Sequence, residues 1–270
     1  MIVAAPPAVT VAELVAAVRA QQGGGAALET FATAESPRPT ARASLLVVAA
    51  HAGAGATAVS VALADALGRF DLRVQLIDAA PSERSGMLGA TDHDMANAGN
   101  SWRTGRRSAI TVLRPVHTTS PADLPPLPPT ESDVVVTDAG TDWRTLTSEP
   151  NPLWPPGEGT ELLVVCRATV PGVRHAEPAL AALPGNPFVV GVGARRWPTP
   201  VSAAFGPRLG RAVSEGRVGL IPADRRLELN GIDTEPFAKP VAAAAAQLSE
   251  VIWPGLSGAP ANQTKKGRRR

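Results

Sequence analysis

The sequence predicts an α/β fold, with a doubly wound, mainly parallel β-sheet between two layers of helices (α/β/α). Three observations predict it. Short runs of Val, Ile and Leu recur along the chain and are continuous rather than alternating, which is typical of strands buried on both faces. Segments with helical spacing of apolar residues lie between several of these runs, as in βαβ units. The chain has 270 residues, 44% of them hydrophobic, which suffices for one large core.

Residues 1–43 are expected to be an N-terminal appendage outside this core. Thr10 and Glu13 form a capping box at the start of a short amphipathic helix, and a linker rich in Pro, Thr and Ala follows. We expect this helix either to pack on the main domain or to dock a partner. The main α/β domain is predicted to span residues 44–253, and residues 254–270 are predicted to form a disordered basic tail.

Within the domain, composition and spacing assign the elements. Seven strands are expected, at residues 45–49, 73–77, 110–113, 134–137, 162–165, 188–192 and 218–221. Four helices are expected, at residues 56–68, 170–183, 200–214 and 241–253. Residues 92–107 are polar and carry no expected element. Residues 115–129 contain six prolines and are predicted to form an irregular surface loop.

Composition excludes several classes of function. The single cysteine, Cys166, excludes an intramolecular disulfide framework and a cysteine-based zinc site, and its apolar neighbours indicate a buried residue. The four histidines lack metal-binding spacing. We find no signal-peptide pattern and no apolar run long enough for a membrane span, so a soluble cytoplasmic protein is expected. Five positive charges fall in the last six residues, so the net charge of +2 conceals a remainder of −3.

A Gly/Ala loop between a strand and a helix is the most informative local feature. Residues 45–67 read LLVVAAHAGAGATAVSVALADAL. This is the layout of a P-loop, in which backbone N–H groups at a helix N-terminus surround phosphates. A working loop carries a lysine before the Thr or Ser, whereas here Ala56 precedes Thr57. The only lysines in the chain are distant in sequence: Lys239, Lys265 and Lys266.

Four segments follow one another in a recognisable order. They are HAGAGAT at residues 51–57, VQLIDAAP at 74–81, DVVVTD at 133–138 and GLIPAD at 219–224. The first is similar to a KGGxGKT phosphate loop and the second to an LLIDADP segment. The third resembles a Walker B strand, and the fourth resembles an IPxD turn near a base pocket. Together they resemble the ParA/MinD family of deviant Walker ATPases over residues 44–253, which implies a sheet of the P-loop NTPase type.

The resemblance also implies a nucleotide site. ATP or ADP would contact the loop and the base turn, at His51, Gly53, Ala54, Gly55, Ala56, Thr57, Pro222 and Asp224. Magnesium would be held by Thr57 and Asp138, and Asp78 would be the catalytic residue that positions water. The base-contacting Asn that often ends the "GVVLN" strand of the family is here Ala194.

Both lysines of the family motif are replaced, by His51 and Ala56, and phosphoryl transfer depends on such cations. His51 would be a weak cation. Other cations could fold over the site, namely Arg84, Arg103, Arg106 and Arg107. Three interpretations stay open: a relic site, a nucleotide-binding site without efficient turnover, and an active ATPase. Mg²⁺ with ATP or ADP, or no cofactor at all, are equally acceptable.

An arginine cluster indicates a possible contact with a partner. Its members are Arg195, Arg196, Arg208, Arg211, Arg217, Arg225 and Arg226. Only Glu215 and Asp224 oppose them in this segment, which leaves a local net charge of +5. The family resemblance implies non-specific DNA binding here, and arginine suits phosphate contacts. A solvated face with local ion pairs is the alternative. Residues 241–253 lack the basic polar face of a membrane-binding helix, so a membrane partner is not expected.

The sequence therefore predicts a non-hydrolysing or weakly hydrolysing positioning, partition or assembly factor that forms a homodimer or binds a protein partner. One alternative is an ATP-binding dimer switch with residual ATPase activity. Another is a nucleic-acid-binding accessory protein that uses the arginine cluster and the basic tail.

Overall fold

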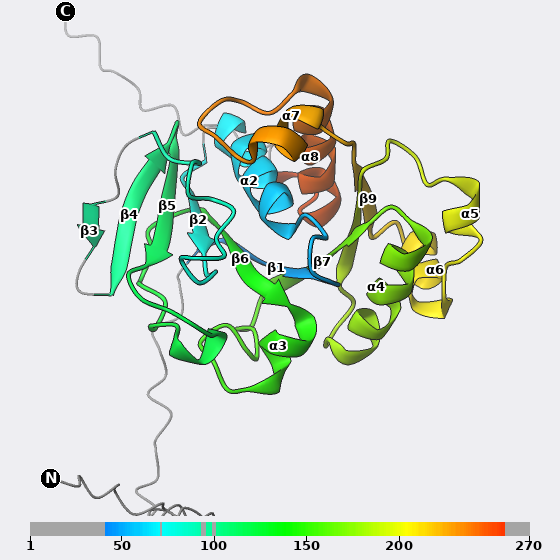
Figure 1. Cartoon of the computed structure of the whole chain (residues 1–270), viewed down its shortest axis with the longest axis horizontal. Coiled ribbons are helices and arrows are strands. Elements are labelled where there is room, and N and C mark those ends of the chain that lie inside the picture. Colours follow the sequence, from blue (N-terminus) through cyan, green and yellow to red (C-terminus); the bar gives the residue numbers. More distant parts are fainter. Residues whose placement is uncertain (1–40, 71, 93–95, 99–100, 257–270) are drawn as a thin grey trace, which may run out of the picture. The chain divides into compact units, whose positions relative to one another are not determined.

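A nine-stranded sheet crosses the molecule, with helices on both of its faces (Figure 1). The computed structural model describes residues 41–70, 72–92, 96–98 and 101–256. The strand order is β3-β4-β5-β2-β6-β1-β7-β8-β9. The strands are β1 (Ala43–Ala49), β2 (Val74–Asp78), β3 (Ala96–Ala98), β4 (Trp102–Arg107), β5 (Ile110–Pro115), β6 (Val134–Asp142), β7 (Thr160–Arg167), β8 (Phe188–Val192) and β9 (Val218–Ile221). All neighbours pair in parallel except β3 with β4 and β4 with β5, which confirms a mainly parallel sheet.

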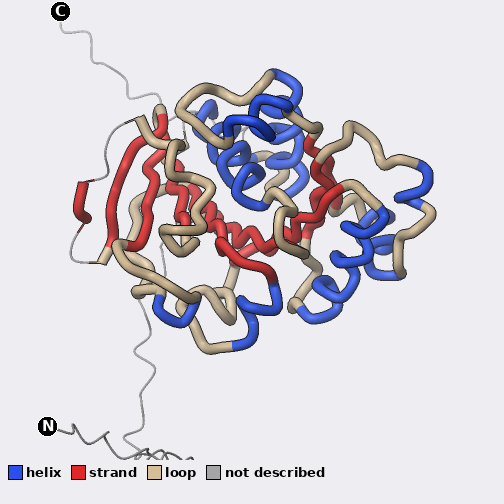
Figure 2. Tube along the Cα trace, in the orientation of Figure 1, coloured by secondary structure: helices blue, strands red, loops and turns tan. Residues whose placement is uncertain are grey.

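The helices form two layers, and the strands form one band between them (Figure 2). The helices are α2 (Ala56–Leu67), α3 (Trp143–Ser148), α4 (Val170–Ala182), α5 (Thr199–Ser202), α6 (Pro207–Ser214), α7 (Arg225–Asn230) and α8 (Lys239–Ile252), with 3₁₀ turns at Gly68–Phe70 and Pro121–Asp123. One layer contains α2, α7 and α8, and the other contains α3, α4 and α6. The expected three-layer arrangement is therefore confirmed.

Strand β1 lies in the centre of the sheet because both of its faces are apolar. Leu45 and Val47 pack toward α2 and α8, whereas Leu46 and Val48 pack toward the opposite layer. All four side chains are buried. Burying a side chain of this size stabilises the fold by roughly 1.5–3 kcal/mol. The continuous apolar run thus fixes β1 between β6 and β7.

Three sequence expectations need correction. Residues 92–107 contain β3 and β4, an antiparallel edge that was not expected because the segment is polar. The expected helix at 200–214 is two helices, α5 and α6, since Gly206 and Pro207 interrupt it. The short helices α3 and α7 were also missed; each begins at an aspartate whose side chain accepts backbone N–H groups, Asp142 and Asp224 respectively.

Other expectations agree with the structure or fall outside it. Of the expected irregular loop at residues 115–129, Pro115 belongs to the end of β5, and the rest contains no strand and no α-helix. Cys166 is fully buried, and burial raises the pKa of its thiol to about 12. No helix within the described residues is long and apolar enough to cross a membrane. The expected N-terminal helix and basic tail lie outside the described residues.

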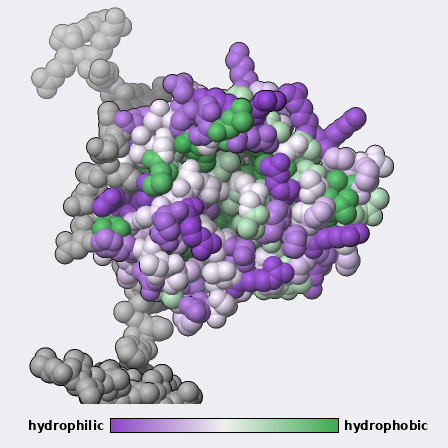
Figure 3. Space-filling view, viewed as in Figure 1, coloured by the Kyte–Doolittle hydropathy of each residue, from purple (hydrophilic) through white to green (hydrophobic). Residues whose placement is uncertain are grey.

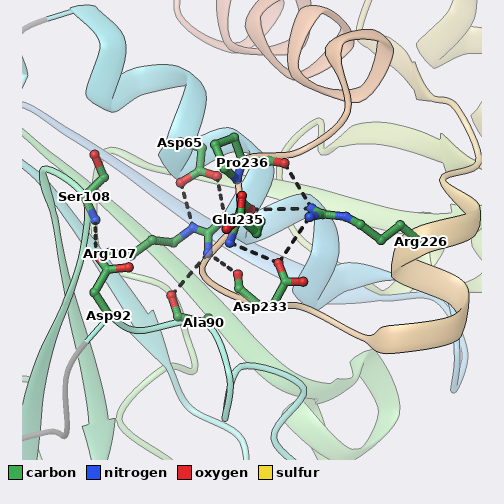
Figure 4. A network of polar contacts seen from close by, with 9 residues as sticks. All are labelled: Asp65, Ala90, Asp92, Arg107, Ser108, Arg226, Asp233, Glu235 and Pro236. Carbon is green, nitrogen blue, oxygen red and sulfur yellow. Dashed lines mark hydrogen bonds and ion pairs between the residues drawn. The ribbon is translucent and has the colours of Figure 1, made fainter.

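Arg107 at the end of β4 connects three segments that are distant in sequence (Figure 4). Its guanidinium bonds both carboxylate oxygens of Asp65 on α2, at 2.8 and 2.9 Å. The remaining N–H groups donate to the carbonyls of Ala90, Asp233 and Glu235. All five N–H donors are therefore used, and the residue is only 2% exposed. Arg226 on α7 binds Asp233 from the other side.

Replacing Arg107 with Met should lower the free energy of unfolding by about 3 kcal/mol or more. The change leaves a largely buried carboxylate and three carbonyls without their donor, which is costly in a buried ion pair. Urea denaturation of Arg107→Met and of the matched control Arg106→Met measures the difference. Arg106 is the exposed neighbour on the same strand, so its replacement should change stability by less than about 0.5 kcal/mol. Equal effects of the two variants would contradict the assignment.

Candidate functional site

The Gly/Ala loop joins β1 to α2 and leaves the N-terminus of α2 without a side-chain cap. Gly53 and Gly55 have φ angles of 73° and 96°, and Gly55 is the residue before α2. A side chain at Gly55 would be strained at this φ and would approach Val192 Cγ1 to 3.3 Å. The uncapped N–H groups at the start of a 12-residue helix can accept an anion. The backbone of the loop is therefore compatible with phosphate binding.

The two motif positions that lack lysine are both occupied without a fixed positive charge. Ala56 is buried in the first turn of α2. His51 accepts a 3.4 Å hydrogen bond at Nε2 from the Arg167 N–H, and its Nδ1 lies 2.9 Å from the Ala52 carbonyl. Its ring centroid is 5.3 Å from that of His175 on α4. His51 thus fastens the loop to β7 and α4.

Charged residues from three adjacent strands meet at the carboxyl ends of β5, β2 and β6. Asp78 of β2 pairs in register with Asp138 of β6. On the other side of β2, Ile77 pairs with Leu113 of β5, so Arg114, the next residue of β5, lies level with Asp78. Arg114 Nε donates to Asp78 Oδ2 at 2.9 Å, and both side chains are almost entirely buried. The sequence analysis missed Arg114; its only signal was an arginine directly after the apolar run of β5.

Asp78 has partners on both carboxylate oxygens. Oδ1 accepts the Ala80 N–H at 3.2 Å, and Oδ2 accepts the Ser85 hydroxyl in addition to Arg114. Arg114 also donates to the Met87 carbonyl at 2.7 Å. These bonds fix the segment after β2, so Asp78 is held inside a closed network.

This segment, residues 79–90, lies against the start of α2. Gly86 packs on Thr57, where an added Cβ would come within 3.2 Å of Thr57 Cγ2. Ser85 and Met87, on either side of Gly86, belong to the Asp78 network. The segment therefore covers the threonine that the sequence assigns to magnesium.

Asp138 is the one carboxylate of the row that lacks a cation. Its Oδ1 accepts the Gly140 N–H at 3.1 Å, but the buried Oδ2 makes no hydrogen bond to any described residue. Burial, together with the neighbouring Asp78, raises the pKa of Asp138 to about 6, and the Thr57 hydroxyl and the Gly140 N–H offset this only in part. A buried oxygen without a partner beside a threonine hydroxyl fits a hydrated Mg²⁺ ion, which prefers oxygen ligands. Thr57 and Asp138 would hold such an ion.

The expected base turn follows β9. Pro222 is buried, and Asp224 caps α7 by accepting the Arg226 N–H at 2.9 Å. Asp224 Oδ2 is buried and has no hydrogen-bond partner among the described residues. Ala194 follows Gly193, just beyond the end of β8. Ile221 at the end of β9 pairs with Val192 at the end of β8, so the turn lies beside the carboxyl end of β8. Strand β8 is separated from β1, the strand before the Gly/Ala loop, by β7.

The arginine cluster divides into two groups. Arg217 precedes β9, and Arg225 and Arg226 follow it, so they lie at opposite ends of that strand. Glu215 pairs with both Arg211 and Arg217, and Arg226 pairs with Asp233. Three members make no hydrogen bond or ion pair to described residues through their side chains: Arg195, Arg196 and Arg225. Figure 3 shows hydrophilic residues over much of one face of the molecule, with hydrophobic residues in small separate patches.

The other arginines considered from sequence do not supply a loop cation. Arg107 is bound to Asp65 on α2. Asp65 is nine residues from Ala56 and therefore lies about 13 Å from it along the helix axis. Arg103 and Arg106 are exposed on β4, the strand beyond β5. Arg84 is exposed in the segment after β2.

No family model matches the chain, and no curated protein matches it in sequence. Solved structures match its fold. The MinD protein in the MinC:MinD cell division complex of Aquifex aeolicus has 16% identity and a TM-score of 0.52, over 81% of this chain and 97% of that chain. A ParA family ATPase from Chlorobium tepidum has 14% identity and a TM-score of 0.53, over 77% and 98%. The chain has the MinD/ParA fold.

A putative plasmid partition protein from Borrelia burgdorferi bound to AMPPNP also matches, with 13% identity and a TM-score of 0.52 over 78% of this chain and 98% of that chain. The MinD/ParA fold confirms the fold class expected from the four motif segments. Sequence identities of 13–16% show a shared fold and nothing more, so the roles of the individual site residues stay predictions.

The ionisation of Asp138 should make the metal-free protein less stable as pH rises from about 4 to about 6. The folded-state pKa of about 6 lies above the ordinary value of 3.8, so the folded protein holds the proton more tightly, and ionisation destabilises it by about 3 kcal/mol in all. Urea unfolding of wild type and Asp138→Asn across this range tests the difference. The asparagine of the variant cannot ionise. The stability of the variant relative to wild type should therefore increase as pH rises toward 6 and keep that increase above pH 6. A constant difference would contradict the raised pKa.

Proposed function

We propose that the protein is a positioning, partition or assembly factor that binds a magnesium nucleotide and hydrolyses it inefficiently or not at all. The single observation that carries this proposal is the ion pair between Asp78 and Arg114. A residue that positions water needs an acceptor position that water can reach. In this chain Asp78 already accepts three protein donors, which leaves about one of its four acceptor positions, and the residue has no exposed surface through which water could reach it.

The charge balance supports the same conclusion. Phosphoryl transfer needs cations close to the transferred phosphate, and loss of one such group lowers the rate by orders of magnitude. Ala56 supplies no charge, and His51 is occupied by contacts with Ala52 and Arg167. Binding is less demanding than turnover, because the loop N–H groups and the helix dipole contribute without a lysine.

Magnesium and a nucleotide nevertheless suit the remaining groups. Asp138 Oδ2 is a buried acceptor without a partner among the described residues, and the Thr57 hydroxyl lies near enough to lower the pKa of that carboxyl. The fold-related Borrelia burgdorferi protein is bound to AMPPNP. These observations favour a binding site without efficient turnover over a relic site and over an active ATPase.

A protein partner or a second copy of the chain is part of this proposal. The fold-related Aquifex aeolicus protein is a member of a MinC:MinD complex. A factor that binds but scarcely hydrolyses its nucleotide would use it as a structural ligand, and the partner would recognise the bound form. An ATP-binding dimer switch with residual ATPase activity is the nearest alternative.

Restoring the loop lysine separates binding from turnover. Ala56→Lys should tighten the binding of Mg-ADP and Mg-ATP by about tenfold, the effect of one well-placed charged hydrogen bond. ATP turnover should rise by much less than the orders of magnitude that such a cation supplies in a competent site, because Asp78 remains bound to Arg114. Calorimetry measures the affinity, and phosphate release measures the turnover. Efficient turnover by wild type that is lost in Asp78→Asn, while circular dichroism shows the variant folded and calorimetry shows that it still binds Mg-ATP, would show that Asp78 is catalytic and would reject the proposal.

A second candidate function, non-specific nucleic-acid binding, is favoured by one observation. Arg195, Arg196 and Arg225 are exposed and keep their guanidinium donors free of described partners, unlike Arg211 and Arg217. Arginines without an acid partner are the ones that can neutralise phosphates.

Duplex DNA binding across a range of salt concentrations tests this candidate. Replacing Arg195 and Arg196 together with Ala should reduce the salt slope by about two, roughly one for each lost phosphate contact. Arg211→Ala should change it less, because Glu215 already neutralises that arginine. Fluorescence anisotropy with labelled DNA gives the slopes. Binding that does not depend on salt, or equal effects of both changes, would exclude this interface.

A further inference from the structure

Arg167, the last residue of β7, lies directly beside the Gly/Ala loop. Its backbone N–H donates to His51 Nε2 in the loop at 3.4 Å. Its Cα pairs in register with Val192 of β8, and Val192 is the side chain against which Gly55 packs. The main chain of Arg167 therefore contacts the loop at His51, and its partner on β8, Val192, contacts the loop at Gly55.

The side chain of Arg167 extends over the carboxyl end of β8. Nη2 lies 3.3 Å from the position that a Cβ would take at Gly193, so the guanidinium packs closely on this glycine. Gly193 also has a φ of 106°, which other residues rarely adopt. Beyond Gly193 the guanidinium approaches Glu228 on α7, with Nη2 3.8 Å from Oε1. One side chain thus spans from β7, across β8, toward the helix that follows β9.

Arg167 differs from Arg107 and Arg114, the two buried arginines among the described residues, in what its donors do. Arg107 uses all five N–H groups, and Arg114 is bound to Asp78 and to the Met87 carbonyl. The Arg167 guanidinium makes no hydrogen bond to any described residue, and its separation from Glu228 exceeds hydrogen-bonding distance. Its side chain is 38% exposed, so a ligand can reach it.

We propose that Arg167 is the cation through which this site binds the phosphates of a nucleotide, in place of a loop lysine. The proposal rests on the nucleotide binding proposed above. A guanidinium presents paired N–H donors that match two phosphate oxygens, and it keeps its charge at all relevant pH values. Glu228 holds the side chain over Gly193 by a long ion pair in partly exposed surroundings, which is a weak interaction. A phosphate group therefore competes successfully with Glu228 for Arg167.

The geometry predicts opposite effects for the two members of this ion pair. Removing Arg167 takes away the cation and weakens binding. Neutralising Glu228 removes the competitor and strengthens binding. If Arg167 instead obstructed the space over β8, its removal would strengthen binding, so the sign of the change distinguishes the two roles.

The test measures binding of Mg-ADP and of magnesium pyrophosphate to the full chain by calorimetry. Arg167→Ala should weaken both by about tenfold, and Arg167→Lys should recover part of the loss because charge remains without the planar fork. Glu228→Gln should tighten both by about two- to threefold. The matched control is Arg174→Ala on α4, an exposed arginine without a described side-chain partner, which should bind as wild type does. Pyrophosphate isolates the phosphate contact from any contact with the base.

The outcomes separate this inference from the function on which it rests. No binding of either probe to wild type would reject nucleotide binding, and the role of Arg167 with it. If wild type binds both probes and Arg167→Ala binds them equally well or more tightly, only the role of Arg167 is rejected and the proposed function stands. Circular dichroism and melting temperature establish that each variant is folded. If Arg167→Ala does not fold, Glu228→Gln decides: tighter binding supports the proposal, and unchanged or weaker binding overturns it.

Discussion

The buried ion pair between Arg114 and Asp78 is the interaction on which the organisation of the site depends. Two charges without water are unfavourable unless their hydrogen bonds are also satisfied, and breaking such a pair costs roughly 3–5 kcal/mol. Here the Ala80 N–H, the Ser85 hydroxyl and the Met87 carbonyl complete the set. Because these three groups come from one segment, satisfying the ion pair also fixes that segment across Thr57.

Arg107 holds the far end of the same segment. Its bond to the Ala90 carbonyl lies three residues beyond Met87, the carbonyl that Arg114 holds. Both arginines belong to the β4–β5 hairpin, so one hairpin fixes the path of residues 79–90 at two points. Arg107 extends the connection to Asp65 on α2 and to the turn before α8. The segment over the site is therefore fixed at two points by the β4–β5 hairpin.

Local patterns were sufficient to predict the centre of the sheet but not its charged edge. The strand at residues 45–49 and its Gly/Ala loop are defined by adjacent residues, so periodicity and composition reveal them. Arg114 and Asp78 are 36 residues apart, and their pairing depends on which strands become neighbours. Strand β4 was missed because its polar residues face outward and Arg107 is buried only through its partners. The roles of Thr57, Asp78 and Asp138 stay predictions.

The arginines of this fold suggest how a P-loop can persist without its lysine. A lysine in the loop would add a charge next to Thr57, close to the buried carboxylate of Asp138 and to any bound phosphate. In this chain Asp78 already has its counter-ion from β5, which leaves Asp138 as the one carboxylate of the described strand-end row without a cation. The cation proposed for phosphate, Arg167, remains partly solvated beside Glu228. Positive charge thus comes from the strand ends instead of the loop, and the fold does not depend on a ligand for charge balance around Asp78.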